Sequence, residues 1–238
     1  MNDSQNNVKW RHEFKYLSPE YILSYLEKRT GAVMLHDKHV GEKGFYAIRS
    51  VYFDDMYDTC YYENESGTDP REKFRIRIYN CSSDRISLEL KQREKSRCHK
   101  ISTPISFDDC RTIIDGGIPD VSDDSPYLLK KLVMQMRSRF LRPCVIVSYE
   151  RVPLIWNAGN VRVTFDRNIR SSSDIASFFD PSLACRPILP AGMNMIEVKF
   201  DEFLPDFINE VLQTGRLSQT SFSKYYLCRK YNMASETL

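Results

Sequence analysis

The chain has 238 residues, of which 42% are hydrophobic and 28% charged, an ordinary composition for a globular domain with its own core. The formal net charge at pH 7 is only +2, which argues against a general nucleic-acid binder, and we expect no nucleic-acid partner. No apolar run is long enough to span a membrane, and the N-terminal residues lack the apolar core of a secretory signal.

The seven cysteines are scattered along the chain, and neither they nor the four histidines show the spacing of a metal site. An odd number of unclustered cysteines is typical of free thiols in a reducing compartment. We therefore expect a cytoplasmic protein that does not use zinc.

Segments in which apolar and polar residues alternate dominate the chain and predict β-strands. In chain order they cover residues 9–16, 47–54, 73–79, 86–91, 100–105, 145–151, 161–166 and 195–200. Helices are expected at residues 20–28, 107–115, 127–139, 204–213 and 221–231. Because strands outnumber helices and most follow one another directly, we expect one α+β domain over residues 1–238, built on an antiparallel sheet.

Local residues set the expected ends of these elements. Ser18-Pro19 and Ser125-Pro126 each predict a serine N-cap with proline at the first helical position, and Ser106 is expected to cap the helix that follows it. Ser221 is expected to cap the last helix. Pro153, two residues after Arg151, is expected to distort the end of that strand.

Residues two apart on a strand share a face, about 7 Å from one another. On the polar faces of the predicted strands, basic residues recur, and most of these strands also carry an acid: Arg11, Glu13 and Lys15; Lys73, Arg75 and Arg77; Glu89 and Lys91; Arg162 and Asp166; Glu197 and Lys199. For any one strand, an open sheet with one solvated face explains the pattern. Taken together, the strands favour another explanation, because like charges at this spacing repel by about 2 kcal/mol at an effective dielectric constant near 20.

A sheet closed into a barrel, with polar side chains inside and helices outside, explains both the basic residues and the acids among them. The acids would pair with some of the cations or hold a metal ion that bridges to phosphate. The guest expected in such a barrel is a polyanion.

Eight motifs follow one another on these strands and on the last helix: RHEFKY (11–16), SVYFDD (50–55), KFRIRIY (73–79), LELKQR (88–93), SYER (148–151), VRVTFD (161–166), MIEVKF (195–200) and SFSKYY (221–226). In this order they resemble the VTC domain, the polyphosphate polymerase domain of the vacuolar transporter chaperone family. That domain belongs to the triphosphate tunnel metalloenzyme, or CYTH, superfamily. The resemblance covers about residues 8–231 and implies an antiparallel eight-stranded β-barrel tunnel with flanking helices.

The resemblance also implies roles for residues at the matching positions. Those expected to act on the transferred phosphoryl group are Arg75, Arg77, Lys91, Arg151 and Lys224. Those expected to bind substrate are Lys15, Lys100, Arg162, Lys199 and Ser223. Glu197 matches the glutamate that holds the metal ion, Mn²⁺ or Mg²⁺. Ser223 and Lys224 are expected in the first turn of the last helix, where backbone N–H groups favour an anion.

The activity implied is ATP-dependent synthesis of inorganic polyphosphate, with ATP and a phosphate chain as partners. A triphosphatase that hydrolyses inorganic triphosphate or a nucleoside triphosphate remains an alternative, as does a domain that only binds polyphosphate. Arg11 stands where many superfamily triphosphatases carry the first of two acids, which favours the polymerase. Nothing resembles the membrane helices of the eukaryotic complex, so any link to a membrane would require a membrane-protein partner.

Overall fold

The computed structural model describes residues 10–95, 97–212 and 217–236. It is built on one antiparallel sheet whose main path runs β1-β10-β8-β7-β3-β4-β5-β6. The strands of this path are β1 (His12–Pro19), β3 (Tyr46–Asp54), β4 (Arg71–Tyr79), β5 (Ser82–Glu94), β6 (Arg97–Pro104), β7 (Arg142–Trp156), β8 (Val161–Ser172) and β10 (Met193–Phe200). Two short strands add to its edges, β2 (Leu35–His36) on β7 and β9 (Arg186–Pro187) on β8.

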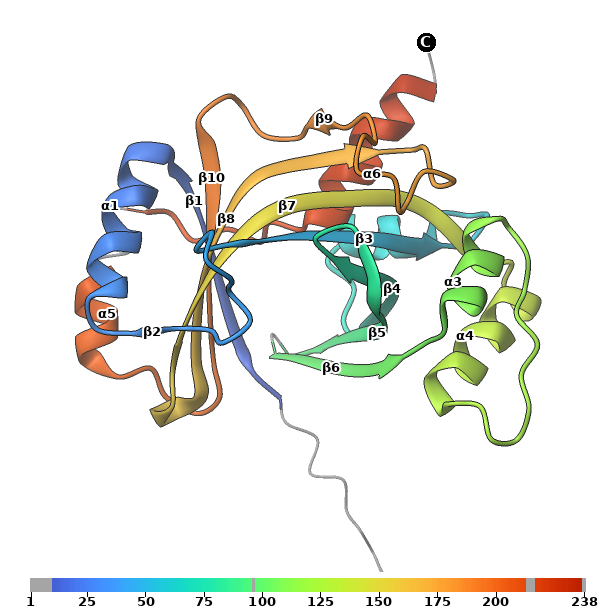
Figure 1. The fold of residues 1–238 in the computed structure, drawn as a ribbon, viewed down its shortest axis with the longest axis horizontal. Coiled ribbons are helices and arrows are strands. Elements are labelled where there is room, and N and C mark those ends of the chain that lie inside the picture. Colours follow the sequence, from blue (N-terminus) through green and yellow to red (C-terminus); the bar gives the residue numbers. More distant parts are fainter. Residues whose placement is uncertain (1–9, 96, 213–216, 237–238) are drawn as a thin grey trace, which may run out of the picture.

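The sheet curls until its first and last strands meet (Figure 1). Arg11 and Cys98 form an isolated antiparallel bridge there, with both backbone N–H···O bonds made at 3.0 and 3.1 Å. This single bridge lies at the ends of β1 and β6, and it closes the curled sheet around an interior. The eight-stranded tunnel expected from the sequence is therefore confirmed.

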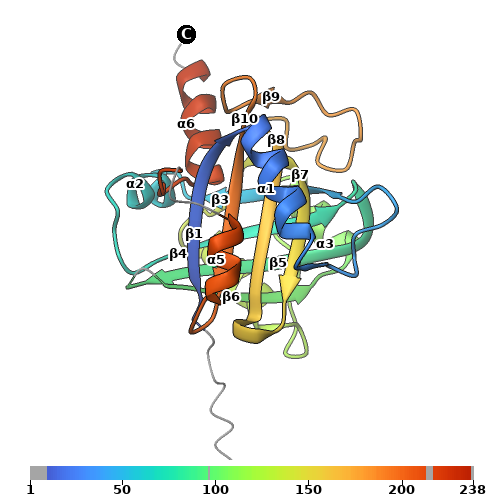
Figure 2. The same cartoon turned by 90° about the vertical axis from the view of Figure 1, so that its left-hand side faces the viewer.

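Helices cover the outside of the curled sheet (Figures 1 and 2). They are α1 (Glu20–Gly31), α2 (Thr59–Glu65), α3 (Phe107–Ile114), α4 (Tyr127–Ser138), α5 (Asp206–Leu212) and α6 (Lys224–Glu236), with a short 3₁₀ turn at Ala158–Asn160. α1 and α5 lie over β1, β10 and β8, whereas α3 and α4 lie on the opposite side. Among the described residues, no helix is long and apolar enough to cross a membrane.

The apolar faces of the strands point outward, under these helices. In β4, Phe74, Ile76 and Ile78 are fully buried in a cluster with Leu132 and Met136 of α4. On the other side, Leu23 and Leu26 of α1 and Ile208 and Leu212 of α5 pack on Val163, Phe165, Ile196 and Val198. Because side chains alternate along a strand, burying these residues outside turns the charged residues between them to the inside.

All eight predicted strands form, most of them longer than predicted, although residue 9 of the first lies outside the described residues. The five predicted helices also form, with residue 213 likewise outside, but α2 was not predicted. Ser106 caps α3 as expected, accepting from the Asp109 N–H at 3.0 Å.

The predicted caps of α1 and α4 are wrong. Pro19 and Pro126 themselves occupy the cap positions, and neither helix has a side-chain cap bond. The reason is tertiary for α1, because β1 keeps its pairing with β10 through Ser18 and Pro19. The Ser125 hydroxyl instead accepts from the Ser122 N–H in the loop before α4.

The expected distortion at Pro153 is also wrong, because β7 continues to Trp156 with Pro153 in register with Thr164 of β8. The Pro153 carbonyl accepts from the Asp37 N–H, on the side away from β8. The N–H that proline lacks would point to that same side, beyond the end of β3, so no bond to β8 is lost. Arg151 consequently keeps its inward position.

The turn between β7 and β8 offers a test of this packing. Gly159 has φ +71°, its carbonyl accepts from the Asp201 N–H, and a Cβ added to it would overlap the carbonyl oxygen of Phe203. Gly159→Ala should therefore lower the free energy of unfolding by about 1–3 kcal/mol in chemical denaturation. Gly41→Ala, at a glycine with open space around it, is the matched control and should change little. Equal stability of the two variants would contradict the packing of this turn.

Candidate anion-binding cavity

The curled sheet encloses a cavity of about 600 Å³. Every site residue predicted from the sequence lines it: Lys15, Arg75, Arg77, Lys91, Lys100, Arg151, Arg162, Glu197, Lys199, Ser223 and Lys224. Tyr52, Tyr149 and Tyr225 add aromatic surface to the wall. Strands distant in sequence thus bring their charged faces to one enclosed space.

Strand register arranges the charges in rows. Lys73 of β4, Lys91 of β5 and Lys100 of β6 are cross-strand neighbours, and one step along the strands Arg75 is the neighbour of Glu89. Like charges placed directly opposite destabilise a sheet, so each row needs negative charge close by. Buried carboxylates meet that need.

Glu89 holds the first group of cations and has only 2% of its surface exposed. Its carboxylate accepts from Arg75 Nε at 2.6 Å and from Lys100 Nζ at 2.7 Å, and Arg77 lies 3.8 Å away. Burial alone would raise the pKa of Glu89, but these three cations hold it well below its usual range. Arg75 also donates to the Tyr52 hydroxyl at 2.9 Å, which fixes the guanidinium in the wall.

Glu13 of β1 plays the same part for the lysines of the neighbouring strands. It lies 2.7 Å from Lys91 Nζ, 3.5 Å from Lys199 Nζ and 3.8 Å from Lys15 Nζ. Burial opposes ionisation here too, yet Lys91, Lys15 and Lys199 keep the pKa of Glu13 well below its usual value. The carboxylate therefore stays charged and ties β1, β5 and β10 together across the cavity.

Asp166 and Glu197 hold the third group. Asp166 is fully buried and forms a bidentate pair with Arg151, at 2.6 and 2.7 Å. The same carboxylate lies 2.7 Å from Lys224 Nζ. Glu197 lies 3.1 Å from both Arg151 and Lys199. Fork-shaped bidentate pairing orients the Arg151 guanidinium more firmly than a single contact would.

The start of α6 corrects one sequence expectation. The helix begins at Lys224, and the hydroxyl of Ser223, the residue just before it, accepts from the Tyr226 N–H at 3.3 Å. Ser223 therefore occupies the capping position that we expected for Ser221. Lys224 is the first helical residue and lies over the Tyr149 ring, 4.7 Å from its centre.

Two further basic residues, Arg162 and Lys73, line the cavity. Arg162 lies 2.7 Å from Asp37 and donates to the Tyr46 hydroxyl at 3.0 Å, so it reaches the mouth of the cavity beside the loop after β2. Lys73 lines the cavity but was given no role. The signal was present in the sequence, because Lys73 shares a face with Arg75 and Arg77 in the KFRIRIY motif.

Two carboxylates of the cavity wall, Glu13 and Glu197, are the residues that could hold a divalent cation. The Glu13 and Glu197 side chains contact each other, and each keeps a lowered pKa despite burial and despite the other's charge, because lysines and Arg151 surround them. In the described part of the chain, no group of three or more His, Cys, Asp or Glu side chains is placed to hold a metal ion. The donor set fits a hard ion such as Mn²⁺ or Mg²⁺ that takes its remaining oxygens from a bound phosphate and from water.

Glu89 provides a test of the charge arrangement. Glu89→Gln should destabilise the protein by about 3 kcal/mol at pH 7, because Arg75, Arg77 and Lys100 lose their shared carboxylate. The folded pKa of Glu89 is depressed, so its contribution should be complete above the unfolded value of about 4.3 and be lost as the pH falls through the folded one. Denaturation curves should thus converge in acid.

The exposed Glu42→Gln is the control for that experiment and should match the wild type at every pH. Added tripolyphosphate should restore part of the stability lost by Glu89→Gln, since it replaces the missing negative charge. A variant as stable as the wild type at pH 7 would show that Glu89 does not balance these cations.

Solved structures that share this fold include the following two. A candidate adenylate cyclase from Bacillus halodurans is 16% identical, with a TM-score of 0.52 over 90% of this chain and 95% of the other. A candidate adenylyl cyclase from Hippeastrum, HpAC1, described as having a dominant triphosphatase activity, is 12% identical, with a TM-score of 0.51 over 94% of this chain and 96% of the other. At these identities the likeness concerns the fold alone.

The amino-acid sequence itself places the chain more narrowly. Comparison with curated proteins finds no match. The model of the VTC domain, by contrast, matches residues 10–232, nearly the whole described structure. The chain therefore belongs to the VTC-domain family and has the triphosphate tunnel fold.

Proposed function

We propose that this protein is a metal-dependent polyphosphate polymerase that transfers the γ-phosphoryl group of ATP to the end of a polyphosphate chain. One observation carries the proposal. Among the described residues, eight lysines and arginines of the cavity wall share four carboxylates: Glu13, Glu89, Asp166 and Glu197. An enclosed wall with this excess of positive charge suits a linear polyanion better than any neutral substrate.

The geometry supports phosphoryl transfer because such transfer depends on positioning and charge neutralisation more than on a covalent nucleophile. Arg75, Arg77 and Arg151 present guanidinium groups that are already oriented by Glu89, Tyr52 and Asp166. These donors need little rearrangement when a phosphate chain lies along them. Lys91 and Lys100 extend the same wall across β5 and β6.

Different residues would hold the two ends of the bound polyphosphate chain. Lys224 and Ser223, at the start of α6, are suited to orient the phosphate groups that react, and Lys15 and Lys199 neutralise neighbouring oxygens. Glu197, together with Glu13, would hold the divalent ion, which would neutralise phosphate oxygens as charge shifts during transfer. Arg162, which is positioned by Asp37, would meet a polyphosphate chain or nucleotide beside the loop after β2.

A triphosphatase is the second candidate, in which water replaces the acceptor phosphate. The contact between Glu13 and Glu197 favours it, because paired acids on neighbouring strands can support a metal ion without a phosphate chain. The triphosphatase activity described for the Hippeastrum protein also supports this second candidate. We favour the polymerase because the chain belongs to the VTC branch and because Arg11 pairs with Asp201 at 2.8 Å, where a second acid would add a metal ligand.

The reaction is tested by incubating the protein with ATP, Mn²⁺ and a short polyphosphate primer. We expect polyphosphate ladders on a gel with equimolar ADP, and Lys224→Ala should lower the rate of chain synthesis by about a hundredfold. Lys230→Ala, at an exposed residue of the same helix, is the matched control and should retain activity. Release of free phosphate without polyphosphate chains would show that the protein is a triphosphatase and not a polymerase. Tight binding of polyphosphate without any turnover of ATP would show that the protein only binds polyphosphate.

The metal role of Glu197 is tested separately. Glu197→Gln should raise the Mn²⁺ concentration required for half-maximal activity by at least about tenfold, because a charged oxygen ligand is lost. In the presence of a metal chelator, the affinity of this variant for tripolyphosphate should equal or exceed that of the wild type, because Arg151 and Lys199 lose a competing carboxylate. Glu202→Gln, exposed beyond the end of β10, is the control. An unchanged Mn²⁺ requirement would remove Glu197 from the metal site.

A further inference from the structure

Lys73 differs from the other basic residues of the cavity. Among the ion pairs of the described residues, none involves Lys73, whereas its cross-strand neighbour Lys91 has Glu13 and the next, Lys100, has Glu89. The contacts of Lys73 are weaker, with the Ser223 hydroxyl at 3.3 Å and the Tyr225 ring centre at 4.9 Å. A row of three lysines with two carboxylates leaves a repulsion that a bound anion would relieve.

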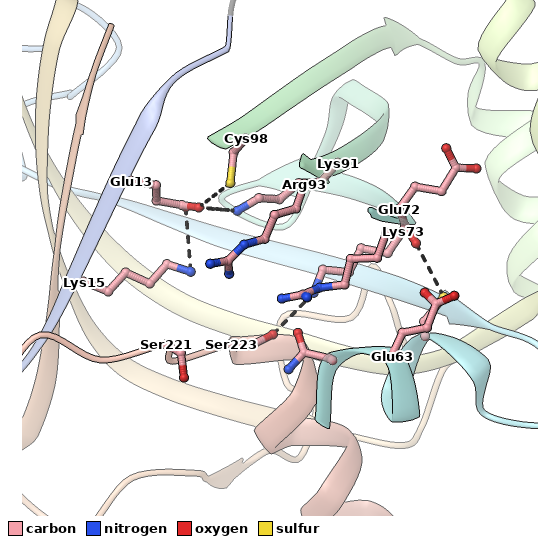
Figure 3. Close-up of a pocket in the computed structure, with 13 residues that line it drawn as sticks. Glu13, Lys15, Glu63, Glu72, Lys73, Lys91, Arg93, Cys98, Ser221 and Ser223 are labelled. Atoms are coloured by element: carbon pink, nitrogen blue, oxygen red, sulfur yellow. Dashed lines mark hydrogen bonds and ion pairs between the residues drawn. The ribbon is translucent and has the colours of Figure 1, made fainter. Parts of the chain in front are cut away.

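Ser223 has a hydrogen to give at the same place. Its hydroxyl oxygen accepts from Lys73 Nζ and from the Tyr226 N–H, which uses both lone pairs and leaves the O–H free to donate. Lys15 is held close by, with its Nζ donating to the Phe222 carbonyl at 3.0 Å. Two ammonium groups and one hydroxyl donor thus face the same space, as Figure 3 shows.

That space is a recess of about 40 Å³. It continues from the main cavity, because Glu13, Lys15, Lys73, Lys91, Cys98 and Ser223 line both. The volume is several times what one water molecule requires. Arg71 and Arg93, and with them Glu63 and Glu72, also line the recess.

We propose that Lys73 and Ser223 bind a phosphate group in this recess, beyond the groups held by Arg75 and Arg77, and so make the protein prefer three linked phosphates to two. The inference rests on the proposed function only in taking linked phosphates as the guest. Glu13, Glu63 and Glu72 also line the recess, but among the described residues none of them forms an ion pair with Lys73. A guest that reaches the recess meets cations from β1, β4 and β5 and the hydroxyl that precedes α6.

The surroundings of Lys73 before any phosphate binds are consistent with this role. The groups that face it are Lys91 on β5, Lys15 and Glu13 on β1, Arg71 on its own strand, and Cys60 and Glu63 on α2. Burial, followed by Lys91 and Lys15, lowers the pKa of Lys73 to about 7. A bound phosphate would raise that pKa, so Lys73 would take one proton from solution as the anion binds.

The sign of the pH dependence follows. Below pH 7 Lys73 is already an ammonium, and its contribution to affinity is complete. Above that pH, each bound anion must first protonate the amine, so affinity falls by up to tenfold per pH unit until the pKa of the complex is reached. An arginine at this position stays charged throughout and should lack the slope.

The experiment is calorimetric titration of the whole protein with tripolyphosphate and with pyrophosphate, without metal. Lys73→Met should weaken tripolyphosphate binding by about tenfold or more and pyrophosphate binding by less than about twofold. Ser223→Ala should act in the same direction and less strongly. Lys73→Arg should keep the affinity at pH 7, and Lys43→Met, at an exposed lysine, should change nothing.

Proton uptake gives a second measurement. At pH 8, titration in two buffers of different ionisation enthalpy should show the wild type taking up close to one proton more per bound tripolyphosphate than Lys73→Arg. Equal losses for both anions in Lys73→Met, no loss for either, or the same proton uptake in wild type and Lys73→Arg would each overturn the assignment. Thermal melts should show Lys73→Met at least as stable as the wild type, since it removes a repulsion.

The outcomes also separate this inference from the proposed function. If tripolyphosphate binding depends on Lys73 as expected but no polyphosphate is made, the polymerase proposal is wrong and the phosphate site in the recess is supported. If polyphosphate is made but the preference for tripolyphosphate does not depend on Lys73, the polymerase proposal is supported and the phosphate site in the recess is wrong. A wild type that binds neither anion would overturn both.

Discussion

Repulsion between basic side chains inside a closed sheet is the constraint on which the rest of this structure depends. Lysines and arginines that alternate along one strand are also neighbours across strands, as Lys73, Lys91 and Lys100 are. Solvent cannot screen them as it would on an open face. Four buried carboxylates hold them apart and in place, each shared by at least two cations. The wall stays positive after this pairing, which is the condition for receiving a polyanion.

The same arrangement decides where the core lies. Because the polar faces point inward, the apolar faces must be buried outside, and the helices provide the cover. α4 packs on β4 and β5, α1 and α5 pack on β8 and β10, and α6 packs beside β7. The protein therefore has its hydrophobic clusters around the tunnel and its charge inside, the reverse of a small β-barrel with a filled interior. Stability then comes from the outer layers, while the inner wall is left to bind ligand.

Sharing each carboxylate among several cations has a chemical consequence. Arg75 and Arg151 are fixed by Glu89 and Asp166 before any ligand arrives, so binding costs little conformational entropy. The carboxylates remain ionised in spite of burial because the surrounding cations lower their pKa. Among the described residues, Lys73 forms no ion pair with a carboxylate, so an anion bound beside it would meet a cation that is not yet paired.

The alternation of residues by itself determined the eight strands, their charged faces and the set of basic residues that meet in the cavity, because a period of two fixes which side chains share a face. It also supplied Lys73, although no local pattern marked that lysine as different from its neighbours. Tertiary structure alone decided the partners: Glu13 reaches lysines of three strands and Arg162 turns to Asp37, pairings between segments far apart in the chain. It also moved the cap of α6 to Ser223. It tolerated Pro153 in β7 because β3 ends opposite Arg151, before Pro153 is reached.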